Sequence, residues 1–382
     1  MRALCVTLAV VAAAVLCVAR TSADDETPVS LDASRITLKV QDAPLGEVLA
    51  AVARQSGNQP LVPPGDAAEK RVTLELADVP YWQALDKLCT KTGLAYEPSP
   101  RMRALRLVRI ERQRLPAADV TAHAGPFEVT LRLGHMRRIR PRVDNRDGAE
   151  CLRCVFLYLW EDRLPTMETD LVVTRMTAPD GSEVPLVSRS DLYARLAGGF
   201  EICPVGTVYY DVESIPKDLK RVRSIEGLVR VTFGVGSDAI AIPNVLGGGV
   251  RSATVGKSTL SAEPITAGAG RRWLKLRETF EGQEVNPTIY PADSPFVIVL
   301  VDPKGGRHIG LGRWGGMLSR EGQIVGPDGQ PEGGQVVKGP GETLVRFDNL
   351  PDLAGAWTLV HTVPRKLVTR EYPFRFDDVV LP

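Results

Sequence analysis

The chain carries almost no net charge and, beyond its first residues, no long hydrophobic run. It has 47 Lys and Arg residues against 46 Asp and Glu residues. A balance this close to zero supplies no field over the whole protein that would attract nucleic acid or anionic lipid. After residue 19, no stretch is long and apolar enough to span a bilayer as a helix. Composition therefore argues against a nucleic-acid-binding protein and against a protein with several membrane spans.

Cysteine and histidine are also scarce, with 6 Cys and 4 His in 382 residues. Two of the cysteines, Cys5 and Cys17, fall in the N-terminal apolar stretch, and four cysteines in a chain this long do not make a disulfide scaffold. No histidine lies in an HExxH motif, and none lies near a GxSxG motif or in a triad-like context. We therefore predict no catalytic residue, no cofactor and no metal site. The histidines are His123, His135, His308 and His361.

The N-terminus has the order of a secretory signal. Arg2 precedes an apolar stretch at 3–19, small residues follow at 21–23, and three acids stand at 24–26. This pattern predicts a signal peptide over the first 23 residues. The mature protein is then periplasmic or secreted. A retained membrane anchor is the alternative, although the apolar stretch is at the short limit for a span.

One segment occurs twice, 36 residues apart. Residues 36–57 read ITLKVQDAPLGEVLAAVARQSG and residues 72–93 read VTLELADVPYWQALDKLCTKTG. In each copy, alternating apolar residues predict a strand, and apolar residues at i, i+3, i+4 and i+7 then predict an amphipathic helix. A proline marks the start of the helix and a glycine its end. Asp42 and Asp78 precede the helices and are predicted to cap them.

Two further strands are expected after the second copy. LAYEP and LRLVRIER are separated by SPRMRA, which predicts a hairpin. Residues 35–112 are therefore predicted to form an α+β domain in which a duplicated strand-helix unit places two helices on a small sheet. Residues 24–34 are predicted to be a linker before it. Sharing one core between two copies is a sufficient structural reason for the duplication.

The phrase ADVPYWQALDKLCTKTGLAYEP resembles the short domain at the N-terminus of secretins and TonB-dependent receptors. That domain is called STN or secretin N-domain-like, and the resemblance covers residues 35–112. It implies a periplasmic module that contacts other envelope proteins, sometimes by strand addition, and that carries no catalytic residues. No pore region and no barrel pattern follows in this chain, so the resemblance does not imply a channel.

The sequence of the remaining chain is typical of β structure. Residues 113–125 are predicted to be a linker. Short runs rich in β-branched and aromatic residues, separated by turn signals, then predict two mostly-β sandwich domains at 126–246 and 247–382. A Gly/Pro-rich stretch at about 315–341 is predicted to be a long exposed loop of the second sandwich. These regions resemble paired sandwich domains of bacterial envelope proteins, which adds architecture only.

Four residues are candidates outside the repeat. Cys151 and Cys154 form a CxxC within a predicted strand, where positions i and i+3 point to opposite faces, which opposes a redox pair. A structural disulfide from either one to Cys203 is one alternative, and buried free thiols are the other. A zinc site built from these cysteines and His135 fits no familiar spacing. Trp314, in a Gly-rich stretch, is a candidate ligand-contact aromatic.

The hairpin strand LRLVRIER and the segment near residues 60–64 are the candidate contact edges, because an open sheet leaves unpaired backbone groups at its edges. The favoured hypothesis is a non-catalytic protein–protein interaction module of the bacterial cell envelope, with secretion or transport as a possible setting. A carbohydrate- or ligand-binding sandwich is the first alternative and would need exposed aromatics around Trp273, Trp314 or Trp357. A hydrolase is the second and would need paired carboxylates in a deep pocket. The edge residues are Arg106, Leu107, Val108, Arg109 and Ile110.

Overall fold

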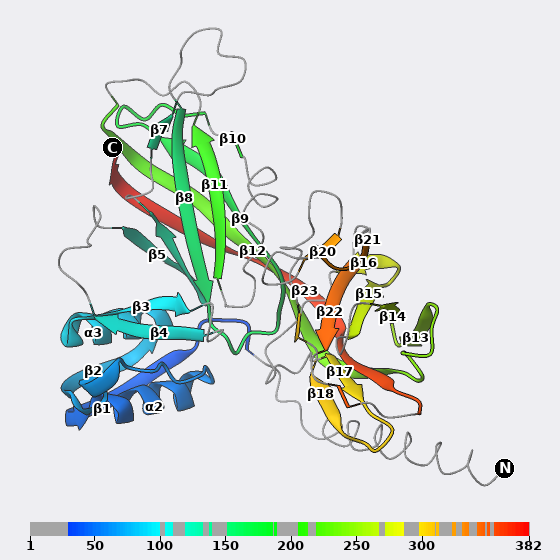
Figure 1. The fold of residues 1–382 in the computed structure, drawn as a ribbon. Coiled ribbons are helices and arrows are strands. Elements are labelled where there is room, and N and C mark those ends of the chain that lie inside the picture. The colour runs from blue at the N-terminus through cyan, green and yellow to red at the C-terminus, as the bar shows by residue number, and fades with distance from the viewer. Residues whose placement is uncertain are drawn as a thin grey trace. The chain divides into compact units, whose positions relative to one another are not determined.

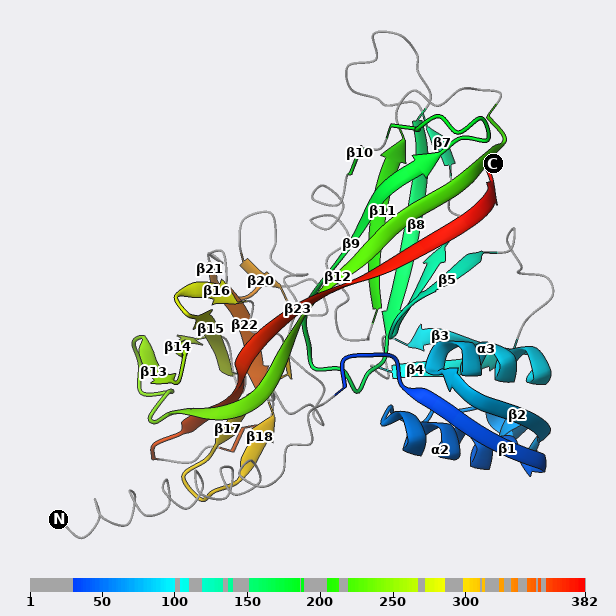
Figure 2. The same cartoon turned by 180° about the vertical axis from the view of Figure 1, so that it is seen from behind.

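The structure is a computed structural model that is mostly β (Figures 1 and 2), and its described residues include the α-helices α2 and α3. Within the residues it describes, no helix is long and apolar enough to cross a membrane. The predicted signal peptide, Cys203 and Trp314 lie outside those residues. The described residues are 30–99, 104–109, 119–132, 137–139, 151–185, 187–188, 205–212, 219–266, 272–285, 298–309, 311–312, 323–325, 331–335, 342–347, 350–351 and 355–381.

The chain divides into two compact units. The first unit contains Ser30–Thr232 and Thr369–Pro382, and the second unit contains Phe233–Val368. The division falls inside two long strands, β12 (Arg221–Ile242) and β23 (Thr358–Val380). It therefore differs from the expected sandwich boundaries at 126–246 and 247–382, because the C-terminal segment returns to the first unit.

The first unit begins with the duplicated segment, and we call residues 35–109 the repeat domain. The predicted order of strand, helix, strand, helix and hairpin is confirmed. A short 3-10 helix at Gly65–Glu69 joins the two copies. The elements are β1 (Arg35–Pro44), α2 (Leu45–Ser56), β2 (Arg71–Pro80), α3 (Tyr81–Thr92), β3 (Leu94–Ser99) and β4 (Ala104–Arg109).

The prediction of one small sheet in this domain is wrong, because its strands form two separate antiparallel pairs. β1 pairs with β2, so the two copies pair with each other, whereas β3 and β4 pair only as their own hairpin. Both strand pairs and both helices still contribute to one hydrophobic core, so the two copies share a core as predicted. Its buried side chains include Ile36, Leu45, Leu74, Leu85, Leu94 and Leu107.

The pairing of β1 with β2 follows the repeat. Ile36 faces Val79, and the equivalent positions in the other copy, Val72 and Ala43, face each other as well. Each paired position of β1 and β2 has an equivalent pair in which the roles of the two copies are exchanged. A pseudo-two-fold axis therefore relates the two copies. A β-bulge interrupts the ladder once near each end, and in each copy two residues separate the bulge from the helix that follows.

The predicted capping role of the two aspartates is wrong. Pro44 and Pro80 directly precede the helices, and neither helix start has a side-chain cap. Asp42 and Asp78 instead occupy the bulges with φ of 49° and 54°. Asp is among the few residues that tolerate this left-handed region. The residues before each helix therefore belong to the β1–β2 ladder, and the aspartates do not form the predicted side-chain caps.

The predicted helix ends are confirmed. Gly57 and Gly93 follow the helices with φ of 76° and 67°, and each N–H donates to a carbonyl of the preceding turn. Both glycines therefore serve as the left-handed stop that the sequence predicts.

The rest of the first unit contains two antiparallel sheets. In one, the strand order is β10-β11-β8-β6-β5, with β7 paired to β8; in the other, β9 lies beside β12, which lies beside β23. Rings of the two sheets are in contact: Phe156 lies 6.2 Å from Phe376, and Phe127 lies 5.2 Å from Tyr372. The strands are β5 (Val120–Ala124), β6 (Phe127–Leu131), β7 (Arg137–Ile139), β8 (Cys151–Trp160), β9 (Thr166–Thr177), β10 (Val187–Ser188) and β11 (Val205–Val212).

The predicted linker at 113–125 is wrong over its last residues. Val120–Ala124 is strand β5, and Gly125-Pro126 is a two-residue turn that joins it to β6. The glycine has a φ of 57°. The Gly-Pro pair is thus a hairpin turn and not the end of a linker.

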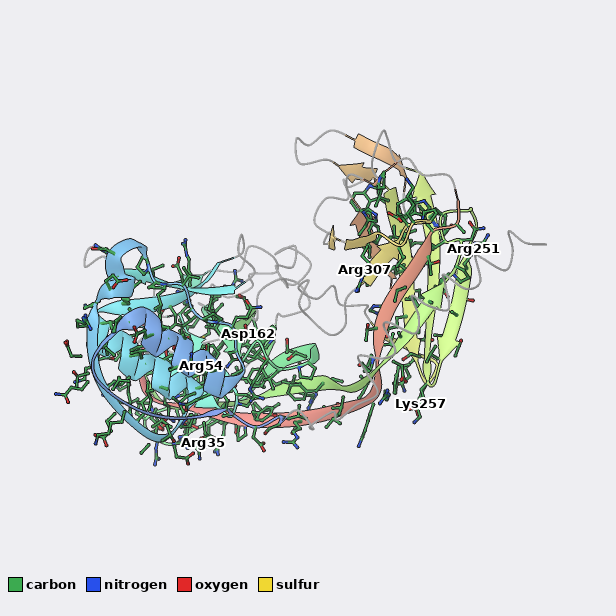
Figure 3. The ribbon with its side chains drawn as sticks, turned by 90° about the horizontal axis from the view of Figure 1, so that it is seen from below. Arg35, Arg54, Asp162, Arg251, Lys257 and Arg307 are labelled. Carbon is green, nitrogen blue, oxygen red and sulfur yellow. The ribbon has the colours of Figure 1, made fainter. Side chains whose placement is uncertain are left out.

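The second unit contains a sheet of order β13-β14-β15-β22-β19, with β16 paired to β15. β17 and β18 extend the ladder of β23. Lys257 in the turn after β13 forms an ion pair with Glu281 and projects from this unit (Figure 3). The strands are β13 (Arg251–Val255), β14 (Ser258–Thr266), β15 (Arg272–Phe280), β16 (Gln283–Val285), β17 (Ile298–Val301), β18 (Arg307–Ile309), β19 (Leu311–Gly312) and β22 (Glu342–Phe347).

The predicted exposed loop at 315–341 contains regular structure. β20 (Gln323–Val325) and β21 (Pro331–Gln335) form an antiparallel pair inside it. The high glycine and proline content of this stretch concealed two short strands.

Candidate functional site

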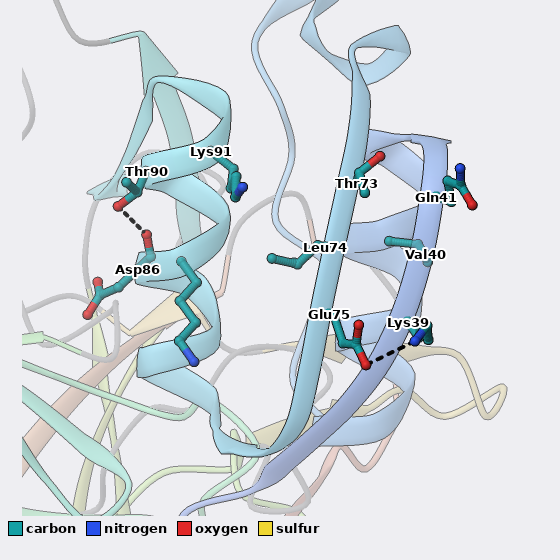
Figure 4. Close-up of a pocket in the computed structure, with 10 residues that line it drawn as sticks. Lys39, Val40, Gln41, Thr73, Leu74, Glu75, Asp86, Thr90 and Lys91 are labelled. Carbon is teal, nitrogen blue, oxygen red and sulfur yellow. Dashed lines mark hydrogen bonds and ion pairs between the residues drawn. The ribbon is translucent and has the colours of Figure 1, made fainter.

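An open groove with a volume of about 910 Å³ runs along β2 and α3 (Figure 4). Residues 73–75 of β2 form one wall and α3 forms the other, while residues 39–41 of β1 complete the lining. Within the described residues, β2 pairs only with β1, so its other edge borders this groove. The residues contributed by α3 are Asp86, Lys87, Thr90 and Lys91.

The corresponding position in the first copy is closed by a side chain. The Gln55 Oε1 atom accepts a hydrogen bond of 2.9 Å from the N–H of Thr37, and its Nε2 atom donates one of 2.9 Å to the carbonyl of the same residue. One amide thus satisfies both backbone groups of an edge residue, as a neighbouring strand would. The outer edge of β1 has no opening for another chain at this point.

The second copy lacks this closure. Thr73 and Lys91 stand 36 residues after Thr37 and Gln55, so they occupy the equivalent places. A lysine has no acceptor to offer an N–H group. No side chain among the described residues bonds to the backbone N–H or C=O of Thr73, whose hydroxyl accepts from the N–H of Asp42 at 3.0 Å. By the pseudo-two-fold, the backbone of Thr73 faces the groove.

The groove has a positive rim. Lys39 is paired with Glu75 at 3.1 Å, and both side chains are exposed. Asp86 directs its carboxylate away from β2 (Figure 4). The other two charged residues of the groove are Lys87 and Lys91, and neither forms an ion pair with a residue that the structure describes. An extended chain in this groove would therefore meet backbone groups on one side and two ammonium groups on the other.

The predicted contact edge on β4 is less open than the sequence suggested. The N–H of Leu107 donates to the carbonyl of Val62 at 3.2 Å, and Val62 forms a parallel bridge with Arg106. The Arg106 side chain also pairs with Glu97, while Ile110 lies outside the described residues. Part of this edge is thus used within the chain. Val108 and Arg109 belong to the same strand, and Arg109 pairs with Asp66.

A second cluster lies where the repeat domain meets the following sheet. The Tyr96 hydroxyl donates to an Asp86 oxygen at 2.8 Å and contacts a Glu128 oxygen. The His123 Nε2 atom lies 3.0 Å from the other Asp86 oxygen. Burial, together with the nearby Asp86 carboxylate, raises the pKa of Glu128 to about 8. Sequence reasoning missed this cluster because its members come from α3, β3, β5 and β6 and form no linear motif.

The cluster also bears on the hydrolase alternative, which needs paired carboxylates in a deep pocket. Glu128 is 4% exposed, and the Tyr96 hydroxyl lies against it. This carboxylate is therefore buried against Tyr96 and is not open to solvent.

The repeat domain is joined to the sheet of β8 by a buried polar network. Glu161, just after β8, is fully buried. Its carboxylate accepts hydrogen bonds from the Ser34 hydroxyl at 2.6 Å, the Arg163 Nε at 2.7 Å and the Asn58 amide at 3.3 Å. Next to it, Asp162 (Figure 3) accepts from a backbone N–H after α2. These bonds fix the C-terminal end of α2 to the sheet.

The other candidate residues are only partly placed. Cys151 and Cys154 both lie in β8, which confirms the strand context that opposes a redox pair, and Cys154 is fully buried. Because Cys203 lies outside the described residues, a disulfide to it stays a prediction. Trp273 and Trp357 are 2% and 5% exposed, so they do not form an exposed aromatic strip.

No family model matches this chain, and a search of curated proteins finds no significant match. The functional conclusion therefore rests on the geometry of the groove and on the sequence.

Proposed function

We propose that the protein is a non-catalytic, exported interaction protein of the bacterial cell envelope that binds an extended segment of a partner protein in the groove between β2 and α3. The observation that carries this is the difference between the two copies. Gln55 closes the edge of β1, whereas Lys91 leaves the equivalent edge of β2 open. Export is inferred from the N-terminal sequence pattern alone.

Strand addition suits this groove for a physical reason. An extended segment that pairs with a free strand edge gains main-chain hydrogen bonds without needing a particular sequence. A helix on the far side of the groove provides contacts for the side chains of that segment. Lys87 and Lys91 favour acidic side chains there, each exposed pair contributing up to about 1 kcal/mol. The resemblance to STN domains supports the same mode of contact.

The β part of the chain supports the proposal as a scaffold. Ring contacts between β8 and β23 agree with the expected β-sandwich in the first unit. The buried bonds of Glu161 hold the repeat domain against that scaffold. The carbohydrate-binding alternative needs exposed tryptophans, and two of its three candidates, Trp273 and Trp357, are buried.

The test exchanges the residues that differ between the copies. Lys91→Gln places an amide where Gln55 stands in the first copy and should close the groove. A phage-displayed library of random linear peptides, screened on the mature chain, should yield binders rich in Asp and Glu that bind Lys91→Gln at least about tenfold more weakly, a loss of about 1.4 kcal/mol.

The matched control is Gln55→Lys, which alters the other copy and should leave peptide affinity unchanged. Methylation of alternate backbone nitrogens in a selected peptide should also weaken binding, because strand addition needs those N–H groups. A screen that yields no binder, or binders with equal affinity for Lys91→Gln and the unaltered chain, contradicts the proposal. Circular dichroism establishes that each variant is folded.

A further inference from the structure

Three potential metal ligands converge beside α3, in the first unit. The imidazole of His123 and the carboxylates of Asp86 and Glu128 each place one ligand atom within 4.8 Å of the others. The three residues come from β5, α3 and β6. An ion bound among them would connect the repeat domain to the sheet that follows it.

One buried nitrogen of this cluster lacks a hydrogen bond, and the cluster has no cationic side chain from lysine or arginine among the described residues. The His123 Nε2 atom is buried and makes no well-aligned hydrogen bond, although it lies 3.0 Å from Asp86. No lysine or arginine among the described residues forms an ion pair with Asp86 or Glu128. The neutral Tyr96 hydroxyl bridges both carboxylates but supplies no charge. Of the two carboxylates only Glu128 is buried, at 4% exposure. The charged form of a buried carboxylate is costly without a positive partner, and a metal ion would supply that partner.

The donor set indicates the class of ion. One imidazole nitrogen and two carboxylate oxygens suit Zn²⁺ and similar first-row ions, whereas Ca²⁺ and Mg²⁺ prefer oxygen ligands alone. The site also has a route to solvent. His123 lines an open pocket of about 710 Å³, together with residues 226–228 of β12 and 373–375 of β23.

We infer that Asp86, His123 and Glu128 bind a divalent transition-metal ion, with Zn²⁺ as the best match to the donors. Tyr96 is a positioning residue, since its hydroxyl contacts both carboxylates. The ion cross-links α3 to β5 and β6, and so it stabilises the junction behind the groove. This inference does not depend on peptide binding.

The experiment uses the mature chain after treatment with EDTA and dialysis. Titration with Zn²⁺ in a calorimeter should show one equivalent bound, together with a rise in melting temperature. Co²⁺ should bind with visible absorption bands. His123→Gln should reduce Zn²⁺ affinity by at least about tenfold, since even outer hydrogen-bond partners of ligands matter that much.

The control is His308→Gln, which makes the same change at an imidazole that pairs with Asp302 at 3.1 Å in the second unit. It should leave Zn²⁺ affinity unchanged. If His123→Gln does not fold, Glu128→Gln serves as the second variant, because it keeps a polar partner for Tyr96. Absence of Zn²⁺ binding overturns the inference, and so does equal binding by the unaltered chain and the folded cluster variant.

Discussion

The Lys39 ammonium lies 3.1 Å from a Glu75 oxygen, and these two residues hold the same position in the two copies of the repeat. They face each other at the centre of the register of β1 and β2, where the pseudo-two-fold axis passes. If both copies had the same charged residue at this position, the two side chains would repel each other. The opposite charges of Lys39 and Glu75 avoid this repulsion. Because both side chains are exposed, the pair contributes at most about 1 kcal/mol.

The same comparison applies to positions 55 and 91. The duplication preserves what the shared core needs, namely the apolar face of each helix and the strand register. The copies differ at the surface, where one edge is closed by Gln55 and the other is left open. Function is therefore expected at the positions where the copies differ.

The bulges provide a prediction about backbone conformation. Asp42 has a φ of 49°, where a Cβ is unfavourable and glycine is not strained. Asp42→Ala should lower the free energy of unfolding by about 1 kcal/mol, whereas Asp42→Gly should be close to neutral. Urea denaturation of both variants measures the difference. The same order is expected at Asp78, with a φ of 54°. Alanine variants as stable as the glycine variants at both sites would show that the bulge conformation is not costly.

The buried network at the end of β8 provides a prediction about stability. Glu161→Gln keeps the shape of the side chain but leaves Arg163, which is 12% exposed, without its anionic partner. Breaking a buried ion pair in this way should cost about 3–5 kcal/mol. Glu371→Gln is the matched control, because it removes an exposed pair with Arg230 and should cost less than about 1 kcal/mol. Equal midpoints of chemical unfolding for the two variants would be inconsistent with a junction held by Glu161.

Cys89 provides a prediction about pH. Burial, followed in size by the Asp86 carboxylate, raises the pKa of this thiol from 9.0 to about 12. Alkylation by iodoacetamide at pH 8 should be roughly a thousandfold slower in the native protein than in urea, since only the thiolate reacts. The folded state keeps its proton longer than the unfolded state, so this stabilisation is full below about pH 9 and is lost as the pH rises towards 12.

Mass spectrometry of the peptide that contains Cys89 measures that alkylation rate, with N-acetylcysteine in the same buffers as the control. A native rate equal to the rate in urea would show that the thiol is neither buried nor shifted.

Much of the repeat domain could be predicted because its signals are local. The period of the apolar residues sets strand and helix, and the prolines and glycines set where each helix starts and stops. The same local reasoning failed for Asp42 and Asp78, because a bulge depends on the partner strand. It also failed for Val120–Ala124, because a Gly-Pro pair fits both a linker and a hairpin turn.

By itself, the amino-acid sequence determined the duplication, the order of strand and helix in each copy, and the β character of the remaining chain. These features depend on neighbouring residues in the chain, so periodicity and turn chemistry are enough to specify them. Only the tertiary structure decided which strands pair, which of the two equivalent edges stays open, and that Asp86, His123 and Glu128 come together. These outcomes depend on contacts between residues far apart in the sequence, and such contacts leave no local pattern.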